Sequence, residues 1–175
     1  MNGPTLAPLA THRAARLSGL VAILGAFLLD QATKLSALSA LGRGDVYAVL
    51  PIFNLRLSFN QGISFSLFTE TFTDRPVMLA GITLAITALL GVLLVRSATR
   101  LEAVALGLII GGALGNVFDR LRIGAVIDFL DFHLWGFHWP ASNLADSAIV
   151  IGAIALVATT LIGKRPDPTS EETSP

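Results

Sequence analysis

The side chains best suited to chemistry in this sequence are aspartates, and they are concentrated in one stretch. Four of them fall between residues 119 and 146, where there is no glutamate: Asp119, Asp128, Asp131 and Asp146. Two carboxyl groups within hydrogen-bonding distance of each other cannot both ionise easily, so they share one proton. The ionised group can then activate water as a base, and the protonated group can act as an acid toward an amide. This chemistry requires neither a metal nor cysteine, which the chain lacks.

Asp146 also has a simpler interpretation. It stands directly before residues 147–163, a run without charged side chains that predicts a membrane-spanning helix. An aspartate near the N-terminus of a helix accepts hydrogen bonds from backbone N–H groups and interacts favourably with the helix dipole. Its position alone therefore favours a helix cap, and a catalytic role depends on the other aspartates.

Polar side chains within the other apolar runs are the next candidates. Asp30 interrupts the first run, and a charge deep in a membrane-spanning helix costs about 2.5–3.5 kcal/mol and usually marks a functional site. Lys34, one helical turn later, offers the alternative of a simple ion pair near the membrane interface. Asn116 lies near the end of another run, where its amide needs hydrogen-bond partners. Asp119 and Arg120 follow it, and they are either part of a site or the solvated end of that helix.

Two histidines could bind a metal ion together with a carboxylate. His133 and His138 lie close together in an aromatic-rich segment, next to Asp131. Their spacing matches no strong metal-binding motif, and catalysis by paired carboxylates needs no metal. We therefore expect neither a metal nor any other cofactor.

The composition is that of a membrane protein. Hydrophobic residues make up 53% of the 175 residues and charged residues only 14%, whereas soluble domains carry about 25% charged residues. The formal net charge is zero, so the overall charge does not favour binding to nucleic acid. A membrane-spanning helix needs roughly 20 apolar residues. Runs of this kind predict an all-α membrane protein with four transmembrane helices, at about residues 17–40, 76–95, 101–118 and 146–163.

We expect the four helices to form a single domain, residues 1–163, followed by a polar, disordered tail at 164–175. Arg13 and Arg16 precede the first apolar run as they would in a signal peptide, but no small-residue cleavage site follows, so the helix should be retained. Four spans place both termini on one side of the membrane. Basic residues are denser in the segments on that side, which favours a cytoplasmic location for both termini and for the tail.

Two segments should lie on the outer side. In residues 54–67, apolar and polar side chains alternate before and after a central Gln-Gly pair, which predicts a β-hairpin. Because a lone hairpin cannot pair its edges in hydrocarbon, it should lie at the membrane surface, either as a cap over the helices or as a cradle for an extended peptide. Residues 119–145 contain Trp135, Trp139 and several phenylalanines, so we expect an aromatic loop anchored in the membrane interface.

Glycines recur in the third predicted helix. Gly107, Gly111 and Gly115 are spaced four residues apart, so one face of the helix has almost no side chains. In lipid, such a stripe allows close contact between helices. We interpret it as a packing surface.

Five short motifs occur in order along the chain: DQATK (30–34), NQGISFS (60–66), GGALGNVFDR (111–120), VIDF (126–129) and NLAD (143–146). Together they resemble the motifs of the lipoprotein signal peptidases, also called signal peptidase II, over nearly the whole chain outside its two tails. The resemblance implies a bacterial four-helix aspartyl peptidase of the cell membrane, with cytoplasmic termini and an active site near the outer face. Enzymes of this family remove the signal peptide from prolipoproteins, cutting before a cysteine that already carries a diacylglyceryl group.

The resemblance also implies roles for single residues. Asp128 and Asp146 would be the catalytic pair. The positions that match supporting or substrate-contacting residues of the family are Asp30, Lys34, Asn60, Gly62, Asn116, Asp119, Arg120 and Asn143. Ser142 stands where the family commonly has phenylalanine, and Ile63 and Ser64 stand where small residues are usual. The expected partners are the diacylglyceryl-modified prolipoprotein and membrane lipid, with the enzyme acting as a monomer.

Two other functions are compatible with parts of this pattern. A small transporter or ion carrier would also place Asp30 and Asn116 inside a helix bundle. Transporters usually contain internal repeats, however, and the two halves of this chain are not similar. A purely structural membrane subunit would leave the ordered aspartate motifs without a purpose.

Overall fold

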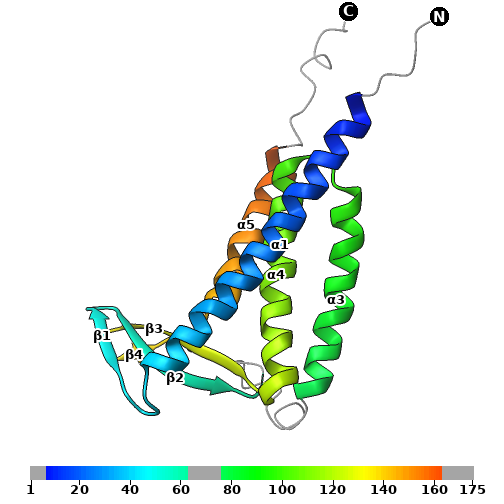
Figure 1. Ribbon diagram of the computed structural model, residues 1–175. Coiled ribbons are helices and arrows are strands. Elements are labelled where there is room, and N and C mark those ends of the chain that lie inside the picture. Colours follow the sequence, from blue (N-terminus) through cyan, green and yellow to red (C-terminus); the bar gives the residue numbers. More distant parts are fainter. Residues whose placement is uncertain (1–6, 63–75, 163–175) are drawn as a thin grey trace, which may run out of the picture.

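The structure is a computed structural model, and it describes residues 7–62 and 76–162 of the chain. Its helices are α1 (Ala7–Ala40), α3 (Pro76–Arg96), α4 (Arg100–Ile123) and α5 (Leu144–Ile162). Its strands are β1 (Tyr47–Leu50), β2 (Phe53–Asn60), β3 (Val126–Leu134) and β4 (Phe137–His138). The helices form an elongated bundle, and the strands lie at the end of the bundle opposite to the start of α1 and the end of α5 (Figure 1).

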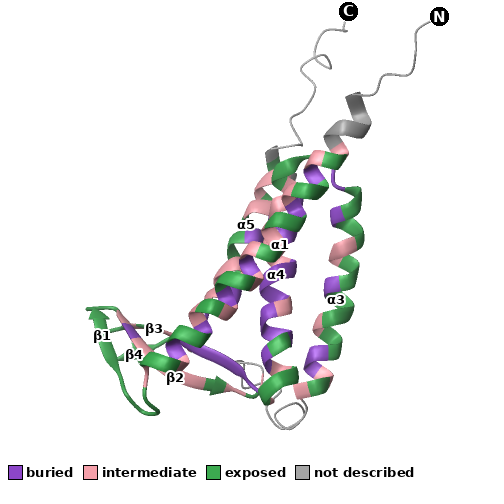
Figure 2. Ribbon diagram, in the orientation of Figure 1, coloured by how far each residue is buried: buried purple, intermediate pink, exposed green. Residues whose placement is uncertain are grey.

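Much of the helix surface is apolar. Among the described residues, three stretches are long and apolar enough to cross a membrane: His12–Ala40, Pro76–Arg96 and Arg100–Ile123. α5 is also apolar but shorter, with 19 residues. The outward faces of α1, α3 and α5 expose large apolar side chains, including Leu17, Val77 and Leu161 (Figure 2). An apolar surface of this extent is stable in lipid rather than in water, which agrees with the predicted membrane protein.

The helix boundaries agree with the prediction to different degrees. Both ends of α3 and α5 lie within two residues of the predicted ends. α1 begins about ten residues earlier than predicted, because the chain around Arg13 and Arg16 is helical although it is polar. Alanine and arginine are both strong helix formers, so a basic end does not stop the helix.

α4 continues past Phe118 to Ile123, so the predicted helix end before Asp119 was wrong. Asp119 is fully buried and has partners from other elements, which removes the need for solvent at this point. The helix ends at Gly124, which has the left-handed φ of 74° and donates its backbone N–H to the carbonyl oxygen of Arg120.

The glycine stripe of α4 is a packing surface, as predicted. An added Cβ atom at Gly107 or Gly111 would collide with backbone carbonyl oxygens of α1. At Gly115 it would collide with the carboxylate of Asp30 instead, so this glycine makes room for a buried charge. Gly112 lies equally close to the backbone of α5. α4 is therefore the central helix, and its small residues bring both neighbours within backbone contact.

A small apolar core joins the helices around α4. Leu94 of α3 and Leu106 and Ile110 of α4 are buried together. The partly buried side chains packed against them are Ile23, Leu90, Leu114 and Leu156. Buried residues follow α4 and continue into β3 (Figure 2).

The strands form an antiparallel sheet in the order β1-β2-β3-β4. β2 corresponds to the first strand of the predicted hairpin, but within the described chain its partners are β1 and β3. The second predicted strand, at residues 63–67, lies outside the described residues. In the β2–β3 register, Ser58 pairs with Asp128 and Asn60 with Val126. The end of β2 therefore lies beside the VIDF motif.

Residues 119–145 do not form the loop that their aromatic residues predicted. They contain the end of α4, then β3 and β4, joined by a turn in which Trp135 (φ 49°) and Gly136 (φ 83°) are left-handed. Strand formation is favoured by the aromatic and aliphatic residues of β3 and by the partner that β2 offers. Trp135 is 96% exposed, and Phe137 and Trp139 are also exposed, so aromatic side chains remain free for a membrane interface.

Candidate active site

The end of α4, the start of α5 and β3 meet at the predicted catalytic aspartates. Asp128 is on β3 and only 2% exposed, and Asp146 is in the first turn of α5. Asn116 of α4 and Asn143, which directly precedes α5, are both buried and hydrogen-bonded to these carboxyl groups. The fold thus brings together four polar side chains from three separate motifs.

α5 begins with a reciprocal cap. The side-chain oxygen of Asn143 accepts a hydrogen bond from the backbone N–H of Asp146 (3.0 Å), and Oδ2 of Asp146 accepts one from the backbone N–H of Asn143 (3.2 Å). This is a capping box, with an acidic side chain three residues after the cap. The simple interpretation of Asp146 as a helix cap is therefore correct, but it accounts for only one of the carboxylate oxygens.

The other oxygen of Asp146 faces α4. Oδ1 accepts a hydrogen bond from Nδ2 of Asn116 (2.9 Å). The Oδ1 atom of Asn116 accepts hydrogen bonds from Nζ of Lys34 (3.0 Å) and from Nδ2 of Asn143 (3.2 Å), which fixes the orientation of its amide. Asp146 thus accepts two N–H groups at the N-terminal end of α5.

Asp128 has different surroundings. Its carboxyl group accepts a hydrogen bond from Nδ2 of Asn143 (2.7 Å). Burial, together with the charge of Asp146, raises the pKa of Asp128 to about 7, although hydrogen bonds from Asn143 and Asn60 oppose the shift. At neutral pH this group is therefore protonated in a large fraction of molecules. The charge of Asp146 contributes to this shift, as expected where two carboxyl groups lie close together.

Both carboxyl groups line one pocket, whose volume is about 380 Å³. The other lining residues are Asn60, Gly62, Asn116, Arg120, Val126, Pro140, Ala141 and Ser142. Nη1 of Arg120 is 3.5 Å from the carbonyl oxygen of Asn116, and its buried Nε atom has no hydrogen-bond partner among the described residues. Arg120 lines the pocket, and its positive charge lies close enough to interact with both carboxyl groups.

A buried charged cluster lies behind the pocket. Nζ of Lys34 makes ion pairs of 2.8 Å with both Asp30 and Asp119, and none of the three side chains is more than 1% exposed. The predicted ion pair between Asp30 and Lys34 is therefore present. It is buried, however, and does not lie at a solvated interface as that alternative expected. Oδ1 of Asp30 also accepts the backbone N–H of Ala145 (2.9 Å) and so positions the first turn of α5.

Asp119 and Gln31 complete this cluster. Oδ2 of Asp119 accepts the backbone N–H of Ile127 (3.2 Å), which ties α4 to β3 directly beside Asp128. The interpretation of Asp119 as a solvated helix end is therefore wrong. Nε2 of Gln31 donates to Asp30 (3.1 Å) and to Asp119 (3.2 Å). Gln31 was not among the predicted site residues, although it follows Asp30 directly and belongs to the DQATK motif.

The predicted site residues fall into two layers. Those that line the pocket with the two aspartates are Asn60, Gly62, Asn116 and Arg120. Those that lie behind it or between the carboxyl groups are Asp30, Lys34, Asp119 and Asn143. Ser142, which departs from the family pattern, also lines the pocket, whereas Ile63 and Ser64 lie outside the described residues.

Asp131, the remaining aspartate of the cluster, is not in the pocket. Its carboxylate accepts a hydrogen bond from Asn54 (3.2 Å) and contacts Nδ1 of His138 (2.9 Å). Burial raises the pKa of Asp131, but the hydrogen bonds from His138 and Asn54 and the nearby Arg56 outweigh it and hold the pKa below its usual value. The ring of His133 stacks on His138 at 4.9 Å. Within the described ranges, no three His, Cys, Asp or Glu side chains are placed to hold a metal ion.

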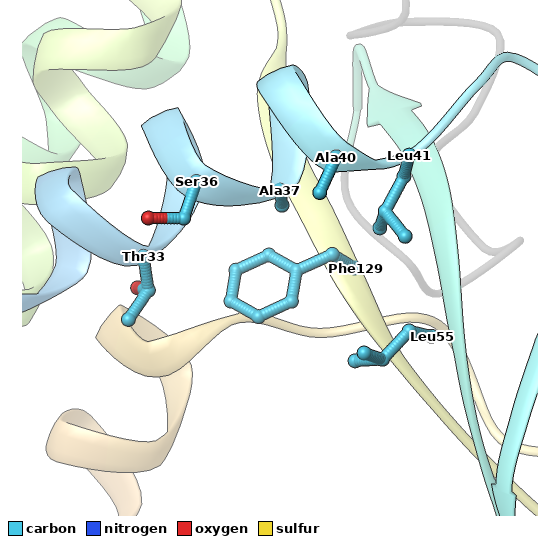
Figure 3. Close-up of a pocket in the computed structure, with 7 residues that line it drawn as sticks. All are labelled: Thr33, Ser36, Ala37, Ala40, Leu41, Leu55 and Phe129. Carbon is cyan, nitrogen blue, oxygen red and sulfur yellow. The ribbon is translucent and has the colours of Figure 1, made fainter.

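The face of β3 opposite to Asp128 carries a second pocket, which is apolar. Because side chains alternate along a strand, Phe129 lies on the face opposite to Asp128, and it sits beside the last turns of α1 (Figure 3). There it lines this pocket of about 260 Å³, together with Thr33, Ser36, Ala37, Ala40, Leu41 and Leu55. The hydroxyl groups of Thr33 and Ser36 donate to carbonyl oxygens of their own helix, which leaves this pocket apolar. The pocket with the aspartates can therefore support acid–base chemistry, and this apolar pocket cannot.

Comparison with known proteins shows the family to which the chain belongs. Residues 22–162 match the family model described as signal peptidase (SPase) II. The chain is 44% identical over 131 residues to the lipoprotein signal peptidase of Burkholderia mallei (strain SAVP1) and 46% identical over 131 residues to that of Paraburkholderia phymatum; each alignment covers 74% of this chain and 79% of the relative. A solved structure of a bacterial membrane enzyme is similar with a TM-score of 0.73 and 27% identity, over 85% of this chain and 92% of the other.

Proposed function

Since the chain belongs to the signal peptidase II family, we propose that it acts on prolipoproteins as an aspartic endopeptidase. It removes the signal peptide in front of a cysteine that carries a diacylglyceryl group. The observation that carries this proposal is the placement of Asp128 and Asp146 in one pocket, joined through Asn143 and differing in their surroundings.

In the proposed reaction Asp146 is the ionised group and Asp128 carries the shared proton. Water gives a proton to Asp146 while its oxygen attacks the carbonyl carbon of the scissile amide, and Asp128 gives its proton to the carbonyl oxygen. When the C–N bond breaks, Asp146 passes its proton to the leaving nitrogen, and Asp128 recovers a proton from the new carboxyl group. The pair returns to its starting state with one proton.

Asn116, Asn143 and Arg120 support this reaction. The two amides hold the carboxyl groups through hydrogen bonds of 2.7–2.9 Å, so little reorganisation is needed when charge moves between them. The guanidinium group of Arg120, which lines the pocket, balances the negative charge of the two carboxyl groups.

We also propose four membrane spans, with both ends of the chain in the cytoplasm and the sheet and the pocket at the outer face. α5 has 19 residues and is about 28 Å long at 1.5 Å per residue, close to the roughly 30 Å of the hydrocarbon core. Arg13, Arg16, Arg96 and Arg100 all lie at the end of the bundle that is remote from the sheet, which supports this orientation. Both aspartates come from one chain, which supports a monomer as the active unit.

Lipid is part of the proposed recognition. The sheet lies where the helices meet the outer membrane surface, and Val46, Val49 and Ile52 in and beside β1 are more than half exposed. The acyl chains of the substrate can remain in the bilayer while the peptide crosses the pocket. The described residues do not support the alternative of a transporter, because Asp30 is fully buried and held by Lys34 and Ala145.

The test is a cleavage assay with purified protein in detergent micelles. A diacylglyceryl-modified precursor should give two products on a gel, and the unmodified precursor should be cut far more slowly. Equal rates on both would indicate a general membrane peptidase instead. A chelator such as EDTA should leave the rate unchanged; loss of activity that added Zn²⁺ restores would contradict the carboxylate mechanism.

A further inference from the structure

A second polar pocket lies at the other end of the bundle, where α1 and α3 come together. Its volume is about 430 Å³, and it is lined by His12, Arg13, Arg16, Val95 and Arg96. Nε of Arg16 donates to the carbonyl oxygen of Val95 (2.9 Å), which joins the two helices. In the described part of the chain, no carboxylate lies within 4.0 Å of the three guanidinium groups. Among residues 7–62 and 76–162, the positive charge of the pocket is therefore not neutralised by an ion pair.

An apolar groove lies further along the same helix. Its volume is about 600 Å³, and every side chain that lines it is apolar. The lining residues are Leu20, Ile23, Leu24 and Phe27 of α1 and Leu114, Val117, Phe118 and Leu121 of α4. Neither the predicted nor the proposed peptidase chemistry uses this groove.

The polar pocket and the groove share one face of α1. Arg13, Arg16, Leu20, Ile23 and Phe27 follow each other at intervals of three or four residues, which places them on one stripe of the helix. At a rise of 1.5 Å per residue, the cations stand one or two turns beyond the start of the groove. This face of α1 therefore combines cations at the membrane boundary with an apolar channel inside the bilayer.

We propose that this surface binds an anionic diacyl phospholipid of the bilayer. The phosphate of the head group lies on Arg13, Arg16 and Arg96, and an acyl chain occupies the groove between α1 and α4. Guanidinium groups suit a phosphate because each offers several N–H donors in a planar fork. Basic pockets between helices at the cytoplasmic side are a recurrent way of binding anionic head groups.

The signal peptide of the substrate fits this surface less well. Signal peptides begin with a positively charged region, which would meet the arginines. The groove also uses a different face of α4 from the catalytic pocket, because Leu114 and Phe118 each lie two positions from the pocket residues Asn116 and Arg120. A lipid in the groove and a substrate in the catalytic pocket can therefore be bound at the same time.

Native mass spectrometry of the whole protein, released from a neutral detergent, tests the proposal. Dioleoylphosphatidylglycerol should bind at least tenfold more tightly than dioleoylphosphatidylcholine, which has the same acyl chains but no net charge. The double variant Arg13→Gln/Arg96→Gln should weaken phosphatidylglycerol binding about thirtyfold, since each basic side chain near an anionic lipid surface contributes about 1 kcal/mol. Arg43→Gln/Arg100→Gln is the matched control, because both arginines are exposed but line neither pocket; it should bind as the unchanged protein does.

A second variant tests the groove. Leu24→Trp adds bulk at an exposed lining position and should weaken the binding of both lipids. Melting curves and cleavage of lipidated precursor confirm that each variant is folded. Equal binding of the two lipids, or unchanged binding by the arginine variant, would overturn the proposal. Displacement of phosphatidylglycerol by inorganic phosphate would show that the arginines bind free anions. Displacement by a synthetic signal peptide would show that the groove binds the substrate. Either result would also overturn the proposal.

Discussion

Asp146 closes the first turn of α5 and also faces the catalytic pocket, and a single substitution separates these roles. In Asp146→Asn the side-chain oxygen can still accept the backbone N–H of Asn143, but the new NH₂ group meets the amide NH₂ of Asn116. We expect a loss of about 1 kcal/mol in the free energy of unfolding, because one hydrogen bond is lost. Cleavage of lipidated precursor should fall by orders of magnitude. An active Asp146→Asn enzyme would leave the residue as a cap alone.

Asp128→Asn should abolish cleavage but change stability in a different way. Because the folded state raises the pKa of Asp128 to about 7, folding favours the protonated form of this group. The free energy of unfolding is therefore highest below about pH 4, where the group is protonated in both states, and it falls as the pH rises toward 7. Asparagine resembles the protonated acid at every pH. The variant should therefore melt like the unchanged protein near pH 4 and at a higher temperature at pH 8. At pH 8 its free energy of unfolding should exceed that of the unchanged protein by an amount on the order of a few kcal/mol. Asp45→Asn, at an exposed carboxylate, is the control and should show no such change.

Combining the two substitutions tests whether the carboxyl groups work as a unit. The double variant Asp128→Asn/Asp146→Asn should be scarcely slower than either single variant, since members of one catalytic unit are not additive. A residual rate that falls by the product of the two single effects would mean that the groups act independently.

The rate should also depend on pH through Asp128. Its proton is needed by the carbonyl oxygen, so kcat/KM should decline as the pH rises through about 7. His138→Gln, which changes a half-exposed histidine outside the pocket, should leave this profile in place. A profile that is flat between pH 6 and pH 9 would contradict the assignment of the proton to Asp128.

At the scale of elements, the contact between α1 and α4 holds the charged cluster in place. Gly111→Ala would drive a Cβ atom into the backbone of α1, and we expect a loss of about 1–3 kcal/mol with lower activity. Gly91→Ala on α3 is the matched control, because no atom lies within 4 Å of an added Cβ there. That variant should be neutral or slightly more stable, since alanine favours a helix more than glycine does. Thermal melts in detergent should be compared for the two variants. Equal losses of stability in both would mean that the loss does not come from the contact between α1 and α4.

The elements differ in how far the sequence predicts them. α3 and α5 are bounded by charges or polar residues, so charge-free runs locate them closely. The end of α4 is different. Lys34 of another helix neutralises Asp119, and a contact between distant residues cannot be predicted from the local run of residues around Asp119. β3 was also not predicted, because its aromatic residues are as typical of a membrane-interface loop as they are of a strand. Ordered motifs predicted which residues belong to the candidate site, but not that Asn143 joins the two carboxyl groups, which depends on the turn before α5.

At the scale of the whole molecule, the proposed topology can be tested with reporter fusions. Fusions after Gly42 and near Trp135 should report the outer side of the membrane, and fusions after Ser97 and Gly163 the cytoplasm. The reason is the distribution of arginines, which lie in the short segments at the end remote from the sheet. A cytoplasmic signal at Trp135 would rule out the four-span arrangement, even if the bundle itself is correct.

The reciprocal cap at the start of α5 has a consequence for biosynthesis. A ribosome delivers Asp30 and Lys34 first, Asp128 much later, and Asn143 with Asp146 later still. Until the segment carrying the cap has emerged and packed on α4, Asp128 has neither the amide that holds it nor the carboxylate that shares its proton. On the proposed mechanism, we therefore expect an unfinished chain in the membrane to have no hydrolytic activity toward its neighbours. A premature stop codon before residue 143 should then give a complete loss of function rather than a weakened enzyme.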